Sequence, residues 1–583
     1  MKPANELYDV HHIENFKDMI KATVEKYPDN VAYKFKKNLG KENEKIIEKT
    51  YSEVNKEIEG LATSLLNLGL KDKKVVIISN NRYEWCVSYF AITTSNMIVV
   101  PLDKMLPEGE IKNLISRSKA DAVIYENKYT EIFKKLKESN ELENLKIYIN
   151  MDLEKEANGI LSYKELVEQG LNLIENGNTE YSKIEIDNEK MSALLFTSGT
   201  TAQPKGVMLS QKNICYNVMG IAKIAKMYPT DVLLSFLPLH HTFECTITFL
   251  FGFYSGVTVA FCDGLKYIQK NLQEYQVSVF VAVPLVLETM YKKIMNGVEK
   301  AGKAKLVAKM SKLSNFLYKK LHIDIRRKLF KSILEQLGGK VRVMYFGAAS
   351  MSKEVIDGYN SFGIATIQGY GLTETSPVIA AETDKLKRPG SVGVAPWLVD
   401  LDIVDKDEEG VGEIIAKGPN VMLGYYENED ATNEVLKDGW FYTGDLGYFD
   451  KDGFLYITGR KKEVIVLKNG ENVYPVDIET LVNKIPYVVE SIVFPRPNAK
   501  NEINLGIKVV YDETVIKDTL GEKTEKEYKN IIWDEIKEVN KQLPAFKRLK
   551  ELIITTEPLE KTTTQKIRRF KEFEKILGKK NQK

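Results

Sequence analysis

The N-terminal part of this chain shows a helical periodicity between residues 54 and 68. Large aliphatic residues recur there at intervals of three and four, the spacing that places side chains on one face of an α-helix. These residues are Val54, Ile58, Leu61, Leu65 and Leu68. Thr50 and Glu53 stand before the periodic segment and predict a capping box, while Gly69 is placed to end the helix. We therefore expect one amphipathic helix that covers a hydrophobic layer.

Short apolar runs follow this helix and have the character of strands. Residues 75–79, 97–101 and 122–125 are rich in β-branched and other apolar side chains. Residues 83–93 predict a helix between the first two runs. Strands that alternate with helices are typical of a parallel sheet covered on both faces, so this region is predicted to be α/β.

A polar stretch between two further apolar runs is the strongest candidate for a binding loop. Residues 193–196 and 206–209 predict strands that enter and leave the segment TSGTTAQPKG at 197–206. Backbone N–H groups and hydroxyls in such a loop can surround phosphate oxygens, and a lysine adds positive charge. The candidate phosphate ligands are Thr197, Ser198, Gly199, Thr200, Thr201 and Lys205. A Walker A loop is excluded, because Pro204 precedes the lysine and Gly206 follows it.

Composition narrows the class of protein. The 583 residues are 43% hydrophobic and 28% charged, which is enough to bury a large core. The formal charge is only +2, so no overall positive field would attract nucleic acid. Four cysteines without CxxC spacing are too few for a disulfide framework. The N-terminus lacks the apolar core of a secretory signal, so a cytoplasmic protein is predicted.

One uncharged segment raises the question of a membrane span. Residues 245–262 are 18 residues without a charged side chain. Threonine, serine and glycine interrupt them, and a transmembrane helix needs about 20 predominantly apolar residues. We expect a buried helix, a glycine-containing turn and a core strand there rather than a membrane helix.

Four short motifs follow the binding loop. They are QGYGLTE at 368–374, YTGD at 442–445, GRKKE at 459–463 and KIRR at 566–569. Together with the loop they resemble, in order and sequence, the adenylate-forming (AMP-binding) superfamily of acyl-CoA synthetases, luciferases and peptide-synthetase adenylation domains. The resemblance implies an α/β fold with a large N-terminal domain, residues 1–461, of parallel and mixed sheets covered by helices. A small mobile α+β domain, residues 462–583, would carry the catalytic lysine.

The resemblance also implies a nucleotide site. Tyr370 would stack on adenine, because Gly369 and Gly371 leave its ring accessible. Thr373 would contact phosphate, and Asp445 would accept hydrogen bonds from the ribose hydroxyls.

Magnesium and the moving domain involve a second set of residues. Glu374 and Thr197 are the expected magnesium ligands, since Mg²⁺ favours one or two carboxylates beside phosphate oxygens. Arg460 offers a planar fork for ribose and phosphate oxygens, and Lys462 matches the hinge about which the C-terminal domain turns. Gly470 resembles the glycine that lines the pantetheine tunnel.

The expected catalytic residues are Lys566, His241 and Glu374, the last of these as a magnesium ligand. Lys566 would neutralise charge on the attacking carboxylate and the α-phosphate. The chain departs from the family pattern at Gln565 and at Ala202, where glycine is usual. His241 would hydrogen-bond the substrate carboxylate. Since adjacent side chains point apart on a regular backbone, His240 and His241 are not expected to share a metal ion.

The function implied is ATP- and Mg²⁺-dependent ligation of a medium- to long-chain fatty acid to coenzyme A through an acyl-adenylate. The motifs ENVYP at 471–475 and GPNVMLGYY at 418–426 resemble the long-chain acyl-CoA synthetase branch. One alternative keeps the adenylate but passes the acyl group to a carrier-protein phosphopantetheine. Another is a nucleotide-binding regulator without turnover.

A basic segment at 292–331 is the remaining unusual feature. It holds 13 lysine and arginine residues against Glu299 and Asp324, with apolar residues at helical spacing. Two interpretations stay open at this point. The segment is either a solvated basic face or a peripheral docking surface for an anionic membrane at its inner face.

Overall fold

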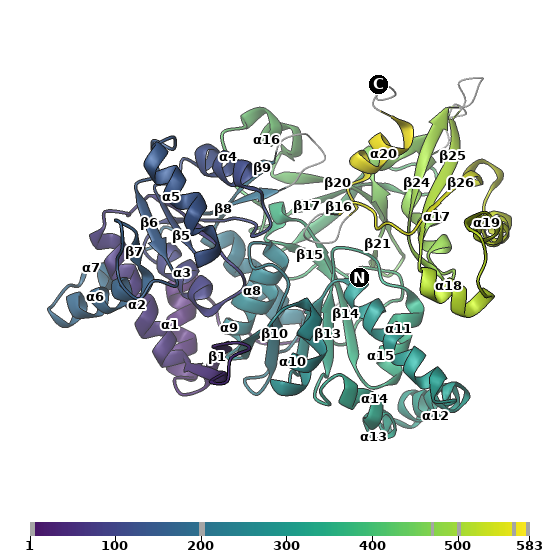
Figure 1. Cartoon of the computed structure of the whole chain (residues 1–583), viewed down its shortest axis with the longest axis horizontal. Coiled ribbons are helices and arrows are strands. Elements are labelled where there is room, and N and C mark those ends of the chain that lie inside the picture. Colours follow the sequence, from purple (N-terminus) through teal and green to yellow (C-terminus); the bar gives the residue numbers. More distant parts are fainter. Residues whose placement is uncertain (1–5, 198–203, 468–471, 498–502, 562–566, 579–583) are drawn as a thin grey trace. The chain divides into compact units, whose positions relative to one another are not determined.

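The computed structural model describes residues 6–197, 204–467, 472–497, 503–561 and 567–578 (Figure 1). It comprises a large unit, Met1–Leu401 with Ala416–Phe441, and a small unit, Asp402–Ile415 with Tyr442–Lys583. The boundary expected between residues 461 and 462 concerns a hinge movement, and it stays a prediction.

One eight-stranded sheet of the large unit carries the candidate binding loop. Its strand order is β18-β9-β8-β4-β3-β5-β6-β7. The strands are β3 (Lys74–Ile78), β4 (Ile98–Pro101), β5 (Ala122–Tyr125), β6 (Ile147–Asn150), β7 (Leu161–Ser162), β8 (Met191–Thr197), β9 (Lys205–Ser210) and β18 (Gly424–Tyr425). Strands β4, β3, β5 and β6 pair in parallel, whereas β8, β9 and β18 pair antiparallel. The predicted strands and the parallel pairing are confirmed.

The second eight-stranded sheet has the order β15-β14-β13-β12-β10-β11-β1-β2. Its strands are β1 (Val31–Lys37), β2 (Lys45–Thr50), β10 (Val232–Ser235), β11 (Thr258–Phe261), β12 (Val279–Ala282), β13 (Val343–Phe346), β14 (Ala365–Gly371) and β15 (Val378–Ala381). The pairing is parallel from β1 through β14, and antiparallel where β2 and β15 close the two edges. Both sheets are therefore mixed, as the fold class predicted.

Helices cover both sheets of the large unit. They are α1 (Phe16–Lys26), α2 (Tyr51–Asn67), α3 (Tyr83–Thr93), α4 (Glu108–Ser118), α5 (Thr130–Ser139), α6 (Tyr163–Glu175), α7 (Glu180–Lys183), α8 (Gln211–Ile224), the π-helix η2 (Glu244–Leu250), α9 (Phe251–Tyr254), α10 (Ile268–Glu274), α11 (Pro284–Lys300), α12 (Ala304–Leu321), α13 (Arg326–Leu329), α14 (Lys331–Gln336), α15 (Lys353–Ser361) and α16 (Glu429–Val435). One hydrophobic cluster joins residues from both sheets with α2, α3, α8 and η2. Further clusters lie against α4 and α5, and against α10, α11 and α15.

The helix expected after residue 50 is α2, and its predicted start is confirmed. The Thr50 side chain accepts a hydrogen bond from the Glu53 N–H at 3.2 Å, and the Glu53 carboxylate accepts one from the Thr50 N–H at 2.8 Å. These two bonds form the capping box. Gly69 follows with a φ of 77°, the left-handed conformation that glycine adopts at the end of a helix.

The uncharged segment 245–262 also has the predicted form. It runs through η2 and α9, turns at Gly256 with a φ of 72°, and enters the buried strand β11. In the part of the chain that the structure describes, no helix is long and apolar enough to cross a membrane. The basic segment forms the end of α11, all of α12 and α13, and the beginning of α14.

The small unit is α+β. A three-stranded sheet of β24 (Val488–Pro497), β25 (Ile503–Tyr511) and β26 (Leu549–Thr555) packs against α17 (Pro475–Val482) and α19 (Glu525–Gln542). The other elements are α18 (Glu513–Leu520), α20 (Arg569–Leu577), β22 (Ile465–Val466) and β23 (Asn472–Val473). A further sheet, whose strand β19 belongs to the large unit, contains β16 (Asp400–Val404), β17 (Gly412–Lys417), β19 (Leu436–Lys437), β20 (Trp440–Phe449) and β21 (Leu455–Arg460). Strands β16, β17 and β20 run across the limits of the two units.

Candidate functional site

The candidate phosphate loop begins and ends on a strand pair of the large unit. Thr197, the last residue of β8, is the cross-strand partner of Lys205, the first residue of β9. The Thr197 hydroxyl also donates to the Lys205 carbonyl oxygen at 3.4 Å. The two flanking candidates are thus held side by side. Ser198, Gly199, Thr200 and Thr201 lie outside the described residues, and their role stays a prediction.

Lys205 and Glu374 converge on one tyrosine. The Lys205 Nζ lies 4.6 Å from the ring centre of Tyr425, where a cation interacts favourably with an aromatic face. The Tyr425 hydroxyl donates to the Glu374 Oε1 at 2.9 Å. Tyr425 therefore links the lysine after the loop to the carboxylate expected to bind magnesium.

This tyrosine reaches the site through backbone pairing. Tyr425 is the partner of Val207 in the β9–β18 ladder, and the Met422 N–H donates to the Glu374 carbonyl oxygen at 2.8 Å. The segment 418–426 thereby bridges β9 and the short 3₁₀ helix η4, Thr373–Thr375. Sequence reasoning used this segment only as a mark of the long-chain branch and missed its place in the site. Its two adjacent tyrosines were the available signal.

The aromatic candidate Tyr370 lies near the end of β14 and is half-buried. Its two glycines differ in what surrounds them. A Cβ added to Gly371 would lie 1.7 Å from the Pro377 carbonyl oxygen, so the close approach of the turn requires glycine. A Cβ on Gly369 would come no closer than 3.8 Å to its nearest neighbour, the Ala380 carbonyl oxygen. Protein packing therefore explains Gly371 and leaves Gly369 open for a ligand.

The segment from Leu237 to Phe243, which carries His240 and His241 and is called the histidine segment below, adjoins this part of the site. A Cβ on Gly347, just after β13, would lie 2.9 Å from the Gly369 carbonyl oxygen and 3.7 Å from the Phe243 ring. The expectation that His240 and His241 point apart is wrong, because they lie on an irregular turn and their ring centres are 4.2 Å apart. Burial, followed by the charge of Lys104, lowers the pKa of His240 to about 3, so this imidazole is neutral near pH 7.

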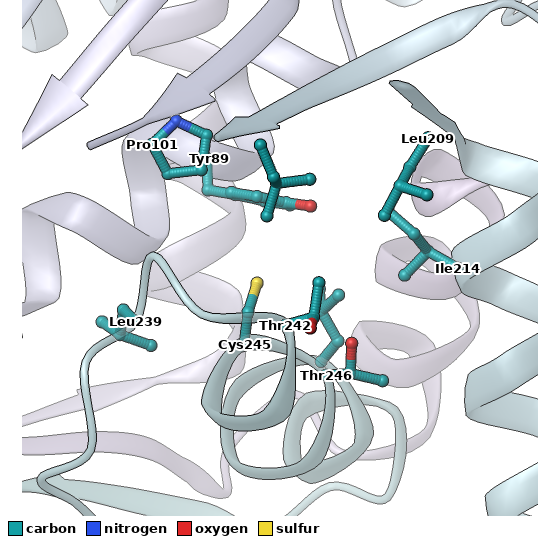
Figure 2. Close-up of a pocket in the computed structure, with 10 residues that line it drawn as sticks. Tyr89, Pro101, Leu209, Ile214, Leu239, Thr242, Cys245 and Thr246 are labelled. Atoms are coloured by element: carbon teal, nitrogen blue, oxygen red, sulfur yellow. The ribbon is translucent and has the colours of Figure 1, made fainter. Parts of the chain in front are cut away.

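An apolar cavity lies beside the histidine segment. Its volume is about 10 Å³, close to the space of one water molecule. Figure 2 shows Tyr89 and Cys245 pointing into the space between Leu239 on one side and Leu209 and Ile214 on the other. Its walls come from β4, β8, β9, α3, α8 and η2. A larger apolar ligand would enter only if these side chains moved.

The small unit holds the second group of candidates. Asp445 on β20 and Arg460 on β21 are cross-strand partners, and Arg460 Nε lies 2.8 Å from Asp445 Oδ1. Asp445 is buried, whereas the Arg460 side chain is 40% exposed. The pair presents a carboxylate and a planar cation together, a combination suited to a ribose and its phosphate.

Lys462, the predicted hinge, is exposed in the 3₁₀ helix Lys461–Glu463. The next residue, Glu463, forms an ion pair with Arg569, whose Nε lies 3.1 Å from the Glu463 Oε2. Arg569 is the last residue of the KIRR motif and also binds the Glu479 carboxylate. Two predicted residues, Gly470 and Lys566, lie outside the described residues, as do Ala202 and Gln565.

The residues present suit magnesium bound together with phosphate. Over the described ranges, no group of three or more histidine, cysteine, aspartate or glutamate side chains is arranged to hold a metal ion. Mg²⁺ needs only one or two carboxylates when phosphate oxygens and water complete its octahedron. Glu374, oriented by the Tyr425 hydroxyl, meets that requirement.

Family comparison gives two matches along the chain. Residues 20–426 match the model of the AMP-binding enzyme, and residues 462–576 match that of the AMP-binding enzyme C-terminal domain. The chain is 30% identical over 463 residues to the long-chain-fatty-acid–CoA ligase FadD15 of Mycobacterium bovis, covering 76% of this chain and 74% of that protein. It is 27% identical over 591 residues to the long-chain-fatty-acid–[acyl-carrier-protein] ligase AEE15 of Arabidopsis thaliana, covering 89% and 79% respectively.

A solved structure with a similar fold is ATP-bound MatB from Rhodopseudomonas palustris. It has a TM-score of 0.73 and 22% identity, covering 96% of this chain and 99% of that one. At this identity the likeness concerns the fold, which agrees with the predicted class.

Replacing Tyr425 with phenylalanine should weaken binding of magnesium-ATP about tenfold. The change removes the hydrogen bond to Glu374 and keeps the ring beside Lys205, and a bond to a charged group contributes roughly 1.5–3 kcal/mol. Isothermal titration with ATP at several magnesium concentrations measures the effect. Tyr426→Phe is the matched control. Equal affinities in the two variants would contradict the assigned link.

Alanine substitutions at the two glycines beside Tyr370 should show which glycine faces a ligand and which one is required by packing. Gly369→Ala should melt at the wild-type temperature but bind ATP more weakly, because its new methyl group would meet the protein only at an ordinary contact distance of 3.8 Å. Gly371→Ala should lower the melting temperature, because its Cβ has no room. Calorimetric melting together with ATP titration tests both. A Gly369→Ala protein with normal ATP affinity would refute a ligand at that position.

Proposed function

The chain belongs to the AMP-binding enzyme family, and from this premise we propose that it ligates a medium- to long-chain fatty acid to coenzyme A, using ATP. The observation that supports this most directly is the Lys205–Tyr425–Glu374 arrangement beside the loop at 197–206. The long-chain-fatty-acid–CoA ligase relative supports the choice of acid and acceptor.

In the first proposed step, a carboxylate oxygen of the acid attacks the α-phosphorus of ATP. The bond from this phosphorus to the bridging oxygen breaks, pyrophosphate leaves, and an acyl-adenylate remains. Lys205 and Lys566 would neutralise charge that builds on the phosphate oxygens. Magnesium, held by Glu374 and Thr197, would supply further charge neutralisation at the leaving pyrophosphate.

In the second step, the CoA thiol loses its proton to solvent, its sulfur attacks the acyl carbon, and AMP leaves with the electrons of the broken carbon–oxygen bond. This step requires that Lys566 withdraw and the thiol enter. We assign Lys462 as the hinge for that exchange, because it is exposed on a short helix where a change of φ and ψ is tolerated. Gly470 would leave room for the pantetheine chain.

We infer that the acyl chain of the acid enters along the apolar lining of the cavity in Figure 2. The cavity adjoins the segment that carries His241, since Leu239 and Thr242 are among its lining residues. His241 would hold the carboxylate while the chain enters between Tyr89, Leu209 and Ile214. Because the cavity is only about 10 Å³, chain entry would need side-chain movement at these positions.

Transfer to a carrier protein is the second candidate. The Arabidopsis relative, named as an acyl-carrier-protein ligase, supports it. The adenylation step is the same in both cases, so only the thiol acceptor distinguishes them. A nucleotide-binding regulator without turnover is disfavoured, because Glu374, Asp445 and Lys566 are all present.

The function is tested by pyrophosphate release from purified protein with ATP, magnesium and acids of increasing chain length. Release should require an acid, and thioester should form with CoA rather than with a phosphopantetheinylated carrier. Lys566→Ala should lower acyl-adenylate formation by at least about 10²-fold, yet still form thioester from supplied acyl-adenylate. Lys571→Ala, an exposed lysine nearby, is the control. Equal loss of both half-reactions would contradict the role of Lys566.

Peripheral membrane contact is part of the proposal and is carried by α12, at the lower right in Figure 1. This 18-residue helix has five lysines and no acidic residue. Val307 and Met310 pack against a hydrophobic cluster of the large unit, and Ser314 is buried. The helix is therefore anchored along one side and free along the other.

The free side of α12 is both basic and apolar. Six of the sixteen large apolar side chains that are exposed in the described residues lie within residues 306–323. They are Leu306, Leu313, Phe316, Tyr318, Leu321 and Ile323. By helical spacing Leu306, Leu313 and Phe316 lie on the free side with the lysines, whereas Tyr318 and Leu321 fall on the side of Ser314. Such side chains can enter the membrane interface while lysines between them meet anionic headgroups, each for about 1 kcal/mol. The combination of lysines and exposed apolar side chains on α12 favours its interpretation as a lipid-binding surface over its interpretation as a solvated basic face.

Two variants of α12 test the charge and the apolar contribution separately. Lys309→Gln with Lys312→Gln and Lys320→Gln should reduce flotation with phosphatidylglycerol vesicles, and so should Leu313→Ser with Phe316→Ser. Wild-type binding should be absent with phosphatidylcholine vesicles and should weaken between about 0.05 and 0.5 M salt. Turnover of a short, water-soluble acid should not change.

The matched control for α12 is the equally long helix α19. Lys526→Gln with Lys529→Gln and Lys541→Gln removes the same charge from an exposed face. This control should float as the wild type does. Equal flotation of the α12 and α19 variants would show that α12 is only a solvated face.

A further inference from the structure

Glu244 is a buried carboxyl group that the proposed reaction does not use. It lies three residues after His241, begins the π-helix η2 and is 0% exposed. A buried ionisable group is costly unless hydrogen bonds satisfy it, and π-helices are rare elements that occur frequently at functional sites. Both features call for an explanation at this position.

The Glu244 carboxyl group connects two elements. Ser235, the last residue of β10, donates to Oε1 at 2.7 Å. Thr248, one turn further along η2, donates to Oε2 at 2.9 Å. The carboxyl group thus joins the end of a central strand to the helix that follows the histidine segment.

Asn81 extends this network to the other end of the segment. Its Nδ2 donates to the Ser235 hydroxyl at 2.9 Å and to the Leu237 carbonyl oxygen at 2.6 Å. Its Oδ1 accepts from the Leu239 N–H at 3.3 Å. Asn81 therefore holds the residues before His240, and Glu244 holds those after His241.

The same helix forms a wall of the apolar cavity. Cys245, Thr246 and Leu250 line it, together with Thr242 just before the helix (Figure 2). The wider turn of the π-helix is shown by the Phe251 N–H, which donates to the Thr246 carbonyl oxygen five residues earlier. A shift of Glu244 would therefore move the cavity wall and the histidine segment together.

We propose that Glu244 is a positioning residue that sets His241 and the cavity wall relative to each other. The acid's carboxylate and the first part of its chain are then bound by one rigid element. This inference rests on the proposed fatty acid ligase function and adds a determinant of its substrate binding.

The protonation state of Glu244 gives this role a pH dependence. Burial raises its pKa from the ordinary value of 4.5 to about 8, although hydrogen bonds from Ser235 and Thr248 oppose the shift. Three thiols among the described residues sense its charge: Cys86 of α3, Cys245, and Cys262 after β11. None of these three thiols carries a positive charge that could offset an ionised Glu244 carboxylate.

The sign of the effect follows from this shift. A raised pKa means that the folded protein holds the proton more tightly than the unfolded chain does. The stability contribution is therefore complete below about 4.5 and is lost as pH rises to about 8. Above that pH the histidine segment should loosen. Glutamine cannot ionise and can still hydrogen-bond to two hydroxyl groups, so it should preserve the neutral arrangement.

Glu244→Gln and Glu244→Ala test the inference against wild type between pH 6 and 9.5. Glu244→Gln should keep kcat/KM at pH 7 within about threefold. It should lose the fall in melting temperature between pH 6 and 8 and the fall in activity around pH 8. Glu244→Ala should raise KM for the fatty acid about tenfold, leave KM for ATP unchanged, and weaken the discrimination between chain lengths.

Glu288→Gln is the control, because burial also raises the pKa of Glu288, yet its carboxylate accepts from the Ser352 N–H instead. It should retain the wild-type fall in activity around pH 8. A Glu244→Gln protein with that same fall, or a Glu244→Ala protein with unchanged KM for the acid, would overturn the inference. Wild type without pyrophosphate release on any acid would instead overturn the proposed function, while the melting profiles report on Glu244 independently.

Discussion

The position of strand β9 between β8 and β18 is the constraint on which the site of the large unit depends. Val207 pairs with Leu195 on one side and with Tyr425 on the other. A slip of one residue in either ladder would turn every side chain of the strand to the opposite face. The register therefore determines that Lys205 meets the Tyr425 ring and that the Tyr425 hydroxyl meets Glu374.

Buried polar side chains hold the loops around this strand pair. Asn217 donates to the Val378 carbonyl oxygen at 2.7 Å, and Asn420 donates to the Thr375 carbonyl oxygen at 2.8 Å. They fix the turn after Glu374, much as Asn81 and Glu244 fix the histidine segment. An unsatisfied buried polar group costs roughly 1–3 kcal/mol, so these loops have few alternative arrangements. Rigid loops of this kind can hold a ligand without reordering on binding.

In the small unit, charged side chains rather than buried amides hold the segments that carry the site candidates. Glu413 accepts from the Gly444 N–H at 3.0 Å and from Lys461 Nζ at 2.7 Å, which ties the turn before Asp445 to the segment after Arg460. Arg569 joins the KIRR motif to Glu463, the residue after the predicted hinge. The charged residues of these motifs cannot be told from ordinary surface charge in the sequence, but in the structure they have different roles.

The sequence by itself determined the local elements and the chemical class of the site. Periodicity, apolar runs and capping residues predicted α2, the strands β3 to β5 and the two strands that flank the loop at 197–206, because these depend on neighbouring residues. Motif order predicted the family and most site candidates. Tyr425, Asn81 and Glu244 were missed, and the two histidine rings proved to be close together, because their contacts join segments that are distant in sequence or lie on irregular backbone. Those contacts form only when β9, β10 and η2 are packed in place, so only the tertiary structure could decide them.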